Sequence, residues 1–287
     1  MVSSNARFGG CVIVAVLGLA LVVGLAVGGF AWVARQWQPD PVPGQQRCVA
    51  TAGAAKTAIT LEQAHYASII AGVAVKRGLP PRAASIALAT AYQETGIRNL
   101  DYGDRDSVGL FQQRPSQDWG TEEELMDPYY ATNEFYDALV KVAGWKSGDI
   151  NDIAQSVQRS GHPEAYRDHV ADARVLASTL TGQSAAGFTC LDRTAADGEA
   201  KRLARALTMT FGSAAKANRD ADVLAITADS TKLAWAYGHF AVANSAQYGV
   251  IKVVVGDREW RTNSMTLPPW LDAETPSKAK QVTITVR

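Results

Sequence analysis

The stretch from Ala91 to Pro115 reads AYQETGIRNLDYGDRDSVGLFQQRP and places one carboxylate, Glu94, at the end of an apolar helix and before a polar loop. Pro80 and Pro81 predict the start of that helix, because a proline in the first turn loses no hydrogen bond. Gly96 predicts its end, because glycine readily adopts the left-handed conformation found there. We therefore expect a helix whose acidic side chain lies in its last turn.

The neighbours of Glu94 on this helix are small. At 100° per residue it shares a face with Ala83, Ala87 and Thr90. A carboxyl group along this stripe would be partly desolvated, which favours the protonated form that a general acid needs. The alternative is a glutamate that merely ends a helix and pairs with Arg98, four residues later.

The sequence that follows the helix adds a second line of argument. Glu94-Thr-Gly is followed by Gly109-Leu-Phe-Gln-Gln and, later, by Tyr166. This series resembles the Glu-Ser-Gly, Gly-Leu-Met-Gln and tyrosine series of goose-type lysozymes and soluble lytic transglycosylases. The string from Tyr102 to Thr121 is similar to a group of membrane-anchored actinobacterial lysozyme-like proteins. The resemblance covers about residues 60–180.

The resemblance implies a site as well as a fold. Glu94 would be the general acid and base that cleaves the bond between N-acetylmuramic acid and N-acetylglucosamine in peptidoglycan. Other groups would line the sugar site: the backbone near Gly109, Gln112, Gln113 and Tyr166. The chain departs from the family where an Asn-Ala-Gly turn is expected, since it has Gln158-Arg-Ser-Gly161 there.

A second carboxylate is usually needed to cleave a glycosidic bond, and Asp101, Asp104 and Asp106 are the nearest candidates. An inverting enzyme would hold one of them several ångströms farther from Glu94 to seat a water, whereas a lytic transglycosylase needs none, because the substrate's own 6-hydroxyl attacks. The alternative for Asp104 and Asp106 is a solvated turn with one internal ion pair. Their spacing does not match a calcium loop, so we expect no metal here.

Aromatic side chains beyond this loop have two candidate roles. Trp119 precedes Gly120 in a predicted loop and is our candidate for stacking against a sugar. Phe135 and Tyr136 fall on a predicted helix, where we expect them in the core.

The start of the chain predicts where this chemistry takes place. An uncharged run from Val12 to Ala34 is long enough to cross a bilayer as a signal-anchor, after a cytoplasmic tail of residues 1–11. The alternative is a cleaved signal peptide, although small-x-small cleavage sites fit poorly here. Residues 35–47 are proline-rich and predict an extended linker. We expect a single-pass protein of the cell membrane with its bulk on the cell-wall side.

The cysteine pair supports this topology. In an exported chain, Cys48 and Cys190 would most simply form one disulfide, whereas two unrelated buried thiols are the alternative. The chain-entropy model assigns a loop of this length about 5 kcal/mol of stabilisation.

The remaining patterns set the domain organisation. A capping box at Thr60 and helical patterns predict a mainly α lysozyme-like domain over residues 48–190, with helices at 61–77, 121–126, 129–142, 150–157 and 163–180. After a Gly- and Ser-rich stretch, residues 191–287 predict a smaller α+β accessory domain, with helices at 198–211 and 229–248 and strands at 250–255, 259–262 and 281–286. The predicted fold class is thus a mainly α lysozyme-like domain, followed by a smaller α+β domain, after one N-terminal transmembrane helix.

The accessory domain has a resemblance of its own. The stretch from Ala234 to Asn244, followed by a valine-rich strand and Trp260, loosely resembles the tail half of zinc-dependent DD-peptidase-like domains of actinobacterial wall enzymes. Such domains need His, Asp and His ligands, and this one has only His239. We expect a degenerate relative without metal that binds the wall, contacts an envelope protein or acts as a spacer.

Composition narrows the function classes. With 28 basic and 28 acidic residues, the chain has no excess of positive charge that would favour non-specific electrostatic binding to nucleic acid or anionic lipid. It has no Gly-rich phosphate loop, paired-cysteine motif or histidine cluster, so we expect no cofactor. Two interpretations remain: a membrane-tethered glycosidase acting on peptidoglycan, or a non-catalytic protein that binds peptidoglycan or scaffolds the envelope. Glu94 in its surrounding motif favours the enzyme, and the unmatched turn and metal-free second domain favour the binder.

Overall fold

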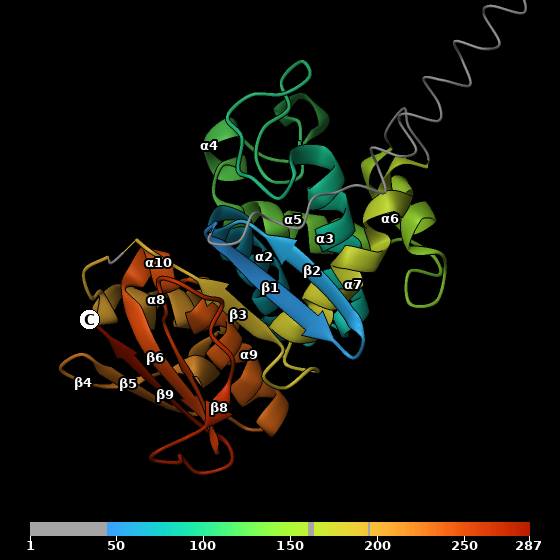
Figure 1. Ribbon diagram of the computed structural model, residues 1–287. Coiled ribbons are helices and arrows are strands. Elements are labelled where there is room, and N and C mark those ends of the chain that lie inside the picture. Colours follow the sequence, from blue (N-terminus) through green and yellow to red (C-terminus); the bar gives the residue numbers. More distant parts are fainter. Residues whose placement is uncertain (1–44, 160–163, 195) are drawn as a thin grey trace, which may run out of the picture. The chain divides into compact units, whose positions relative to one another are not determined.

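The computed structural model describes residues 45–159, 164–194 and 196–287 of the chain. They belong to one compact unit, Gly44–Arg287 (Figure 1). Within these ranges, no helix combines the length and the apolar character that a bilayer crossing requires. The predicted span from Val12 to Ala34 lies outside the described residues, as does most of the predicted linker.

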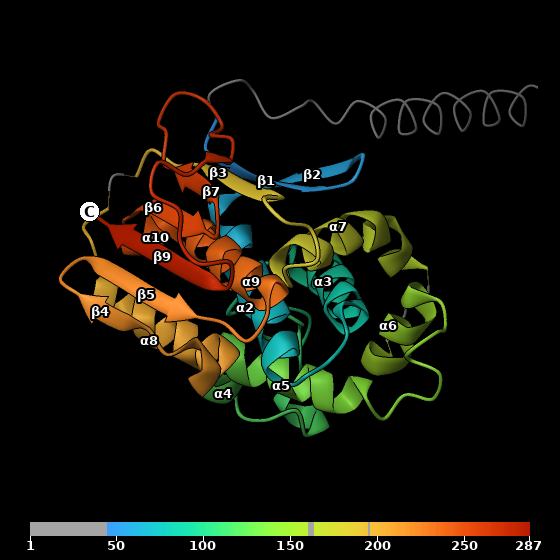
Figure 2. The ribbon, with the colours of Figure 1, turned by 90° about the horizontal axis from the view of Figure 1, so that it is seen from below.

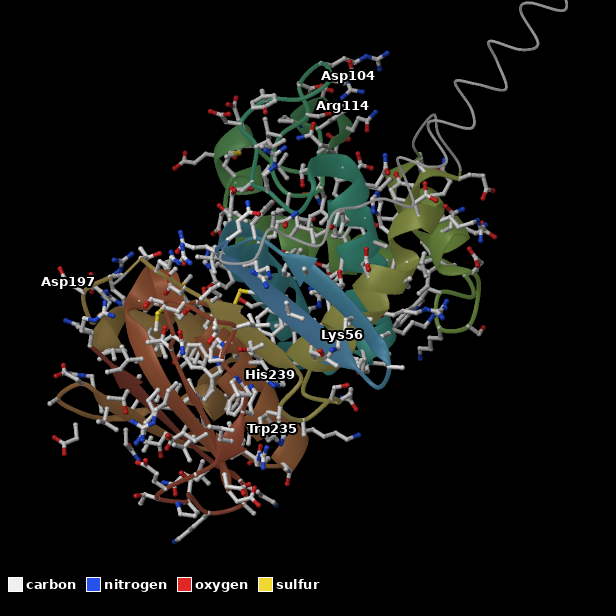
Figure 3. All side chains as sticks on the ribbon, viewed as in Figure 1. Lys56, Asp104, Arg114, Asp197, Trp235 and His239 are labelled. Atoms are coloured by element: carbon white, nitrogen blue, oxygen red, sulfur yellow. A yellow bond between two sulfur atoms is a disulfide. The ribbon has the colours of Figure 1, made fainter. Side chains whose placement is uncertain are left out.

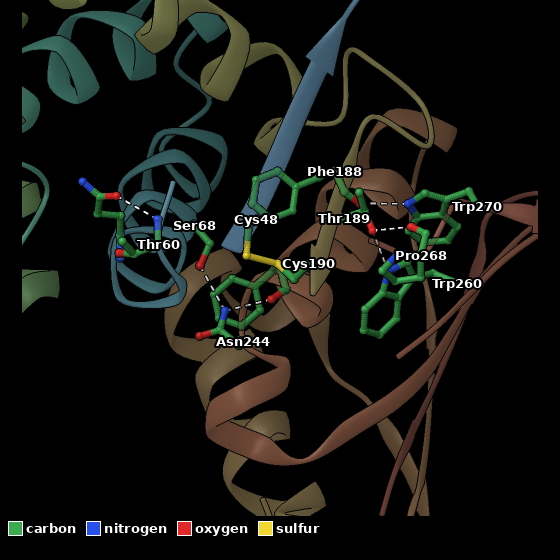
Figure 4. The surroundings of a disulfide bond; sticks show 12 residues. Cys48, Thr60, Ser68, Phe188, Thr189, Cys190, Asn244, Trp260, Pro268 and Trp270 are labelled. Atoms are coloured by element: carbon green, nitrogen blue, oxygen red, sulfur yellow. Dashed lines mark hydrogen bonds between the residues drawn. A yellow bond between two sulfur atoms is a disulfide. The ribbon is translucent and has the colours of Figure 1, made fainter. Parts of the chain in front are cut away.

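We call the part of this unit up to residue 191 its first half and the remainder its second half. A small antiparallel sheet joins the two ends of the first half. It consists of β1 (Arg47–Ala52), β2 (Ala55–Ile59) and β3 (Phe188–Leu191), in the order β2-β1-β3. Cys48 and Cys190 face each other across β1 and β3 and form a disulfide, so the predicted pairing is confirmed (Figure 4).

The predicted fold class is wrong, because the region expected to be mainly helical contains this three-stranded sheet. Burial alternates along β1, where Cys48 and Ala50 point inward. The strands are short, and β1 and β2 are rich in Ala, which is a weak strand signal. The β3 partner lies far along the chain, since Cys48 and Cys190 are 142 residues apart. Long-range pairing of this kind leaves no local pattern to detect.

The α-helices described in the first half are α2 (Leu61–Lys76), α3 (Pro81–Thr95), α4 (Glu122–Leu125), α5 (Pro128–Leu139), α6 (Ile150–Gln158) and α7 (Val170–Leu180). Of these, α2, α5, α6 and α7 pack against α3, which carries Glu94, and α4 packs against α5. The predicted capping box of Thr60 with Gln63 is present at the start of α2. Pro81 begins α3 and Gly96 ends it with φ 64°, as predicted. The small side chains of α3 are almost all buried, so neighbouring helices approach it closely.

The second half is built on a six-stranded antiparallel sheet in the order β4-β5-β9-β6-β7-β8. Its strands are β4 (Asn218–Asp220), β5 (Val223–Thr227), β6 (Val250–Val255), β7 (Arg258–Arg261), β8 (Leu271–Asp272) and β9 (Gln281–Val286). The helices α8 (Ala200–Phe211) and α9 (Thr231–Ala243) pack on it, and the short α10 (Ser245–Tyr248) leads into β6 (Figure 2). The predicted strands at 250–255 and 281–286 are confirmed.

The two halves share a core instead of being joined by a spacer. The indole of Trp260 donates a hydrogen bond of 3.0 Å to Oγ1 of Thr189, and Trp270 donates one of 2.8 Å to the carbonyl of Phe188 (Figure 4). Both acceptors belong to β3, so the predicted domain boundary at residues 190 and 191 falls within a strand that contacts both halves. A Cβ added to Gly72 on α2 would lie 2.2 Å from Thr210 on α8, which shows how closely these helices pack.

Candidate functional site

The carboxylate of Glu94 is held through one of its two oxygens. Oε1 accepts a hydrogen bond of 2.7 Å from the hydroxyl of Tyr166 and one of 3.2 Å from the side-chain amide of Gln158. Among the described residues, no hydrogen bond reaches Oε2. Glu94 itself is half-buried. One oxygen is therefore fixed in place, and the other is free to exchange a proton with a ligand.

The two partners of Glu94 come from elements far along the chain. Tyr166 lies on the 3₁₀ helix Ala165–His169 and is fully buried. Gln158 is the last residue of α6, and its amide also donates a hydrogen bond of 2.7 Å to the carbonyl of Phe111. The same side chain thus connects α6, α3 and the loop that follows α3.

This loop is a tight turn between Val108 and Gln113, which exchange two backbone hydrogen bonds. Thr95, at the end of α3, fixes it in place, because its hydroxyl lies 3.0 Å from the carbonyl oxygen of Leu110. Gly109 has φ 77°, and a Cβ there would lie 2.4 Å from the carbonyl oxygen of Leu125. Only glycine fits that position. The Gly109 N–H already donates to Leu100, so Gly109 supports the loop and offers no donor to a sugar.

The two predicted glutamines of this turn have different partners and different burial. Gln112 is half-buried with φ 48°, and its amide donates a hydrogen bond of 3.2 Å to the carbonyl of Tyr102. Gln113 is only 2 % exposed, and its amide donates to Ala131. Its Oε1 has no hydrogen-bond partner within the described ranges. A buried acceptor of this kind is available to a donor from a ligand or a water.

Glu94 lies in an open cleft with a volume of about 340 Å³. Its walls are mainly polar: Glu94, Asp104, Arg105, Ser107, Gln112, Gln113, Arg114, Gln117, Trp119, Gln158 and Arg159. A second hollow of about 590 Å³ shares four of these residues, Gln117, Trp119, Gln158 and Arg159, and extends to Lys141 on the segment after α5. Together the two hollows form a groove with more volume than a single sugar fills, and half-buried Trp119 lies on the wall that they share.

The candidate aspartates differ in how firmly they are held. Asp106 accepts a hydrogen bond of 2.7 Å from Arg114 and one of 2.8 Å from the backbone of Ser116. Hydrogen bonds from Ser116 and from Arg114 hold the pKa of Asp106 well below its usual range. This carboxylate stays ionised and braces the loop, so it is poorly placed to exchange protons.

Asp104 lies in the cleft with Glu94, but its side chain is 92 % exposed. Its nearest cation is Arg105, at 3.9 Å, which is a loose, solvated pair. Asp104 and Arg114 lie at the outer end of the loop that follows α3 (Figure 3). Of the predicted second carboxylates, neither Asp101 nor Asp106 lines the cleft. The structure therefore places one firmly held carboxylate, Glu94, beside one solvated carboxylate.

Backbone strain is concentrated at this cleft. Among the described residues, the non-glycine residues with positive φ are Ile97, Arg105, Gln112, Asp118, Arg159, Ala186 and Ala221. Three of them, Arg105, Gln112 and Arg159, line the cleft. Such conformations cost free energy and persist where the surrounding structure enforces them, which is common at functional sites.

Sequence reasoning found five of the eleven residues that line the cleft and missed the other six. It placed Glu94, Asp104, Gln112, Gln113 and Trp119 in one site, where they line the same cleft. It did not assign Arg159 or Gln117, and it treated Gln158 only as the start of a turn. The turn Gln158-Arg-Ser-Gly161 was the signal available, but nothing local showed that Gln158 contacts Glu94. Ser160 and Gly161 lie outside the described residues.

His239, the sole candidate ligand in the second half, lies far from any opening. It is fully buried, with Nδ1 at 2.7 Å from the carbonyl oxygen of Thr179, and its ring packs against Trp235 and Trp270. Burial lowers its pKa to about 4. In the described ranges, no group of three His, Cys, Asp or Glu side chains is arranged to hold a metal ion.

A comparison with models of known protein families and with curated proteins finds no match for this chain.

Proposed function

We propose that this protein cleaves the glycan strands of peptidoglycan, with Glu94 as the general acid and base. The observation that carries the proposal is the arrangement of one carboxylate at an open polar cleft, with Oε1 held by Tyr166 and Gln158 and with no hydrogen bond to Oε2 from the described residues. A proton donor must reach the oxygen of the scissile bond, and a half-buried carboxyl group on a rigid helix end meets that need. The resemblance of the surrounding motif to lysozymes and lytic transglycosylases supports the same assignment.

The single held carboxylate favours the transglycosylase route over hydrolysis. In this route Glu94 donates its proton to the glycosidic oxygen, and the bond from that oxygen to C1 of the muramic acid breaks. The 6-hydroxyl of the same sugar then bonds to C1, and its proton returns to Glu94. No water is consumed and no second carboxylate is required. Asp104 is too solvated to be a firmly positioned base, and Asp106 is bound to Arg114.

The remaining cleft residues would bind and orient the sugar chain. Trp119 offers an apolar ring face on the wall shared by the two hollows. Gln112, Gln117 and Arg159 supply amide and guanidinium groups that can donate to hydroxyl and acetamido oxygens. The combined volume of the two hollows suits several sugars of a polymer better than one monosaccharide.

The disulfide supports a location outside the cytoplasm, in an oxidising compartment where disulfides persist. Peptidoglycan would be within reach there. Membrane attachment remains a prediction from residues 12–34, which the structure does not describe.

The test uses residues 44–287, which form one compact unit with its own core and can fold without the preceding segment. Purified peptidoglycan is incubated with the wild type, with Glu94→Gln and with Glu62→Gln, a control on the exposed start of α2. We expect soluble muropeptides from the wild type and the control, and at least a thousandfold slower release by Glu94→Gln. Equal melting temperatures of the three proteins would exclude misfolding.

The same incubation separates cleavage from binding without turnover. Sedimentation of the wild type with the wall material, with no soluble product at any enzyme concentration, would overturn the enzymatic proposal and support a peptidoglycan-binding protein.

A further inference from the structure

The second half of the protein carries a concentration of positive charge that its neutral composition conceals. Lys201, Arg202 and Arg205 are exposed along α8. Lys216 and Arg219 are exposed on the segment that leads from α8 into β4. The whole chain has a formal net charge of zero, so this cluster is a local excess and not a reflection of overall charge. We call these five residues the α8 basic cluster.

The cluster surrounds two hollows on either flank of an exposed ridge formed by Arg205 and Met209. One hollow, of about 280 Å³, lies between α8 and the first half of the protein: His65, Ile69, Pro128, Tyr129, Arg202, Arg205, Ala206, Met209 and Tyr248. The other, of about 430 Å³, lies between α8 and the start of β4: Lys201, Ala204, Arg205, Thr208, Met209, Lys216, Ala217 and Arg219. Neither lining contains an Asp or Glu. Arg205 borders both hollows and can reach an anion in either.

Most of this charge is unneutralised. Within the described ranges, the one carboxylate paired with the α8 basic cluster is Glu199, which contacts Arg202 at 3.1 Å. Arg202 also lies over the ring of Tyr248, 5.7 Å from its centre. The other four cations have no ion pair among the described residues. Clustered like charges in a concave surface raise the local concentration of anions and favour an anionic ligand.

The shape and chemistry of the surface narrow the class of anion. Single-stranded nucleic acids usually need exposed aromatic rings on which bases stack. The two tyrosines here do not supply them, because Tyr129 is half-buried and Tyr248 is 7 % exposed. A bilayer would require an apolar face, and Met209, at 50 % exposure, is the one exposed large apolar side chain in these linings. Two hollows linked by a shared arginine suit a flexible chain with repeated charges.

We propose that the α8 basic cluster binds a polymer of repeated phosphodiester groups that carries no nucleobases. Successive phosphates would occupy the two hollows, with Arg205 between them. Guanidinium groups can contact two phosphate oxygens at once, and lysines add point charges along the path. The site is separate from the cleft around Glu94 and does not depend on the activity proposed for it.

Poly(glycerol phosphate) is the probe, and its affinity for residues 44–287 is measured by titration calorimetry over a range of salt concentrations. With up to five phosphates neutralised, log K should fall against log salt with a slope of about −3. The variant Lys201→Gln/Arg205→Gln/Lys216→Gln/Arg219→Gln should bind at least about tenfold more weakly and with a shallower slope. A matched control removes four exposed lysines elsewhere: Lys56→Gln/Lys232→Gln/Lys278→Gln/Lys280→Gln. The control should bind as the wild type does.

Three outcomes would overturn the proposal. One is an equal loss of affinity in both fourfold variants, which would mean a diffuse charge effect. Another is absence of binding by the folded wild type. The third is tighter binding of a single-stranded DNA oligonucleotide, or of phosphatidylglycerol vesicles, than of poly(glycerol phosphate). Glu94→Gln should bind the polymer as the wild type does, so failure of this proposal and failure of the glycosidase proposal are distinguishable.

Discussion

Glu94 and His239 each lie on a helix that is built mainly of small and apolar residues, yet their surroundings differ completely. Glu94, on α3, borders a cleft of about 340 Å³. His239, on α9, is 0 % exposed and lies close to Trp235 (Figure 3), and its ring packs against both Trp235 and Trp270. Neither helix, taken alone, shows which of the two side chains lies at an opening. Distant elements that pack over such a side chain decide whether it can react with a ligand. Its own helix does not.

The contacts of the two residues show how this difference arises. The hydrogen-bond partners of Glu94, Gln158 and Tyr166, are 64 and 72 residues away and leave one side of the carboxylate open. The partner of His239 is the carbonyl of Thr179, 60 residues away, and aromatic rings close the remaining space. We call the surroundings of His239 the closed region and the cleft around Glu94 the open region. We expect substitutions in the closed region to change stability and substitutions in the open region to change activity.

The largest expected effect is on the closed region. Trp270 is 6 % exposed, and Trp270→Ala would leave a cavity beside His239 and remove the hydrogen bond to Phe188. The free energy of unfolding should fall by about 4 kcal/mol. Denaturant titration measures this loss. Muropeptide release at a temperature where the variant stays folded should be unchanged, and a selective loss of activity there would break the comparison.

The pH dependence of stability provides the next test. The pKa of His239 is about 4 in the folded protein and about 6.5 when unfolded, so below pH 6.5 only the unfolded state gains the proton. The free energy of unfolding should therefore fall by about 3 kcal/mol between about pH 6.5 and about pH 4, and this contribution should level off below that. The variant His239→Gln should lack this decline. A decline of the same size in both proteins would show that other groups cause it.

The open region contains Trp119, which serves as the counterpart of Trp270 in the closed region. Trp119→Ala should reduce muropeptide release about tenfold, because a ring face that contacts sugar is lost. Its effect on the free energy of unfolding should be below about 1 kcal/mol, since this half-buried side chain borders solvent. If Trp119→Ala instead destabilised the protein as strongly as Trp270→Ala, the two regions would not differ as we describe.

Tyr166→Phe is the corresponding test of the hydrogen bond that orients Glu94. Release should slow by about fivefold to tenfold, because one of the two donors to Oε1 is removed while the ring remains. The loss should appear in kcat and leave KM near its wild-type value. A change in KM alone would assign Tyr166 to substrate binding instead.

The smallest expected effect comes from Asp104. Because its carboxylate is solvated, Asp104→Asn should alter the release rate by less than about threefold. A loss comparable to that of Glu94→Gln would identify Asp104 as a second catalytic carboxylate and favour hydrolysis.

Sequence reasoning succeeded where the signal is local. The boundaries of α3 follow from Pro81 and Gly96, and β6 and β9 match their predicted ranges. It failed where partners are distant: β1 and β3 are weakly patterned strands that become a sheet only by pairing with each other. In the site, Glu94 was accessible to motif reasoning, whereas the role of Gln158 depends on how α6 packs. Overall composition likewise concealed the α8 basic cluster, because net charge carries no information about where charges gather.

The most direct test of the central claim is the chemistry of the product. Purified peptidoglycan is digested by residues 44–287 in water enriched in heavy oxygen, and the released sugar ends are examined by mass spectrometry. If Glu94 acts alone and the 6-hydroxyl attacks, the ends are 1,6-anhydro sugars without the label, and Glu94→Gln forms none. Reducing ends that carry the heavy oxygen, or products that persist in Glu94→Gln, would contradict the account.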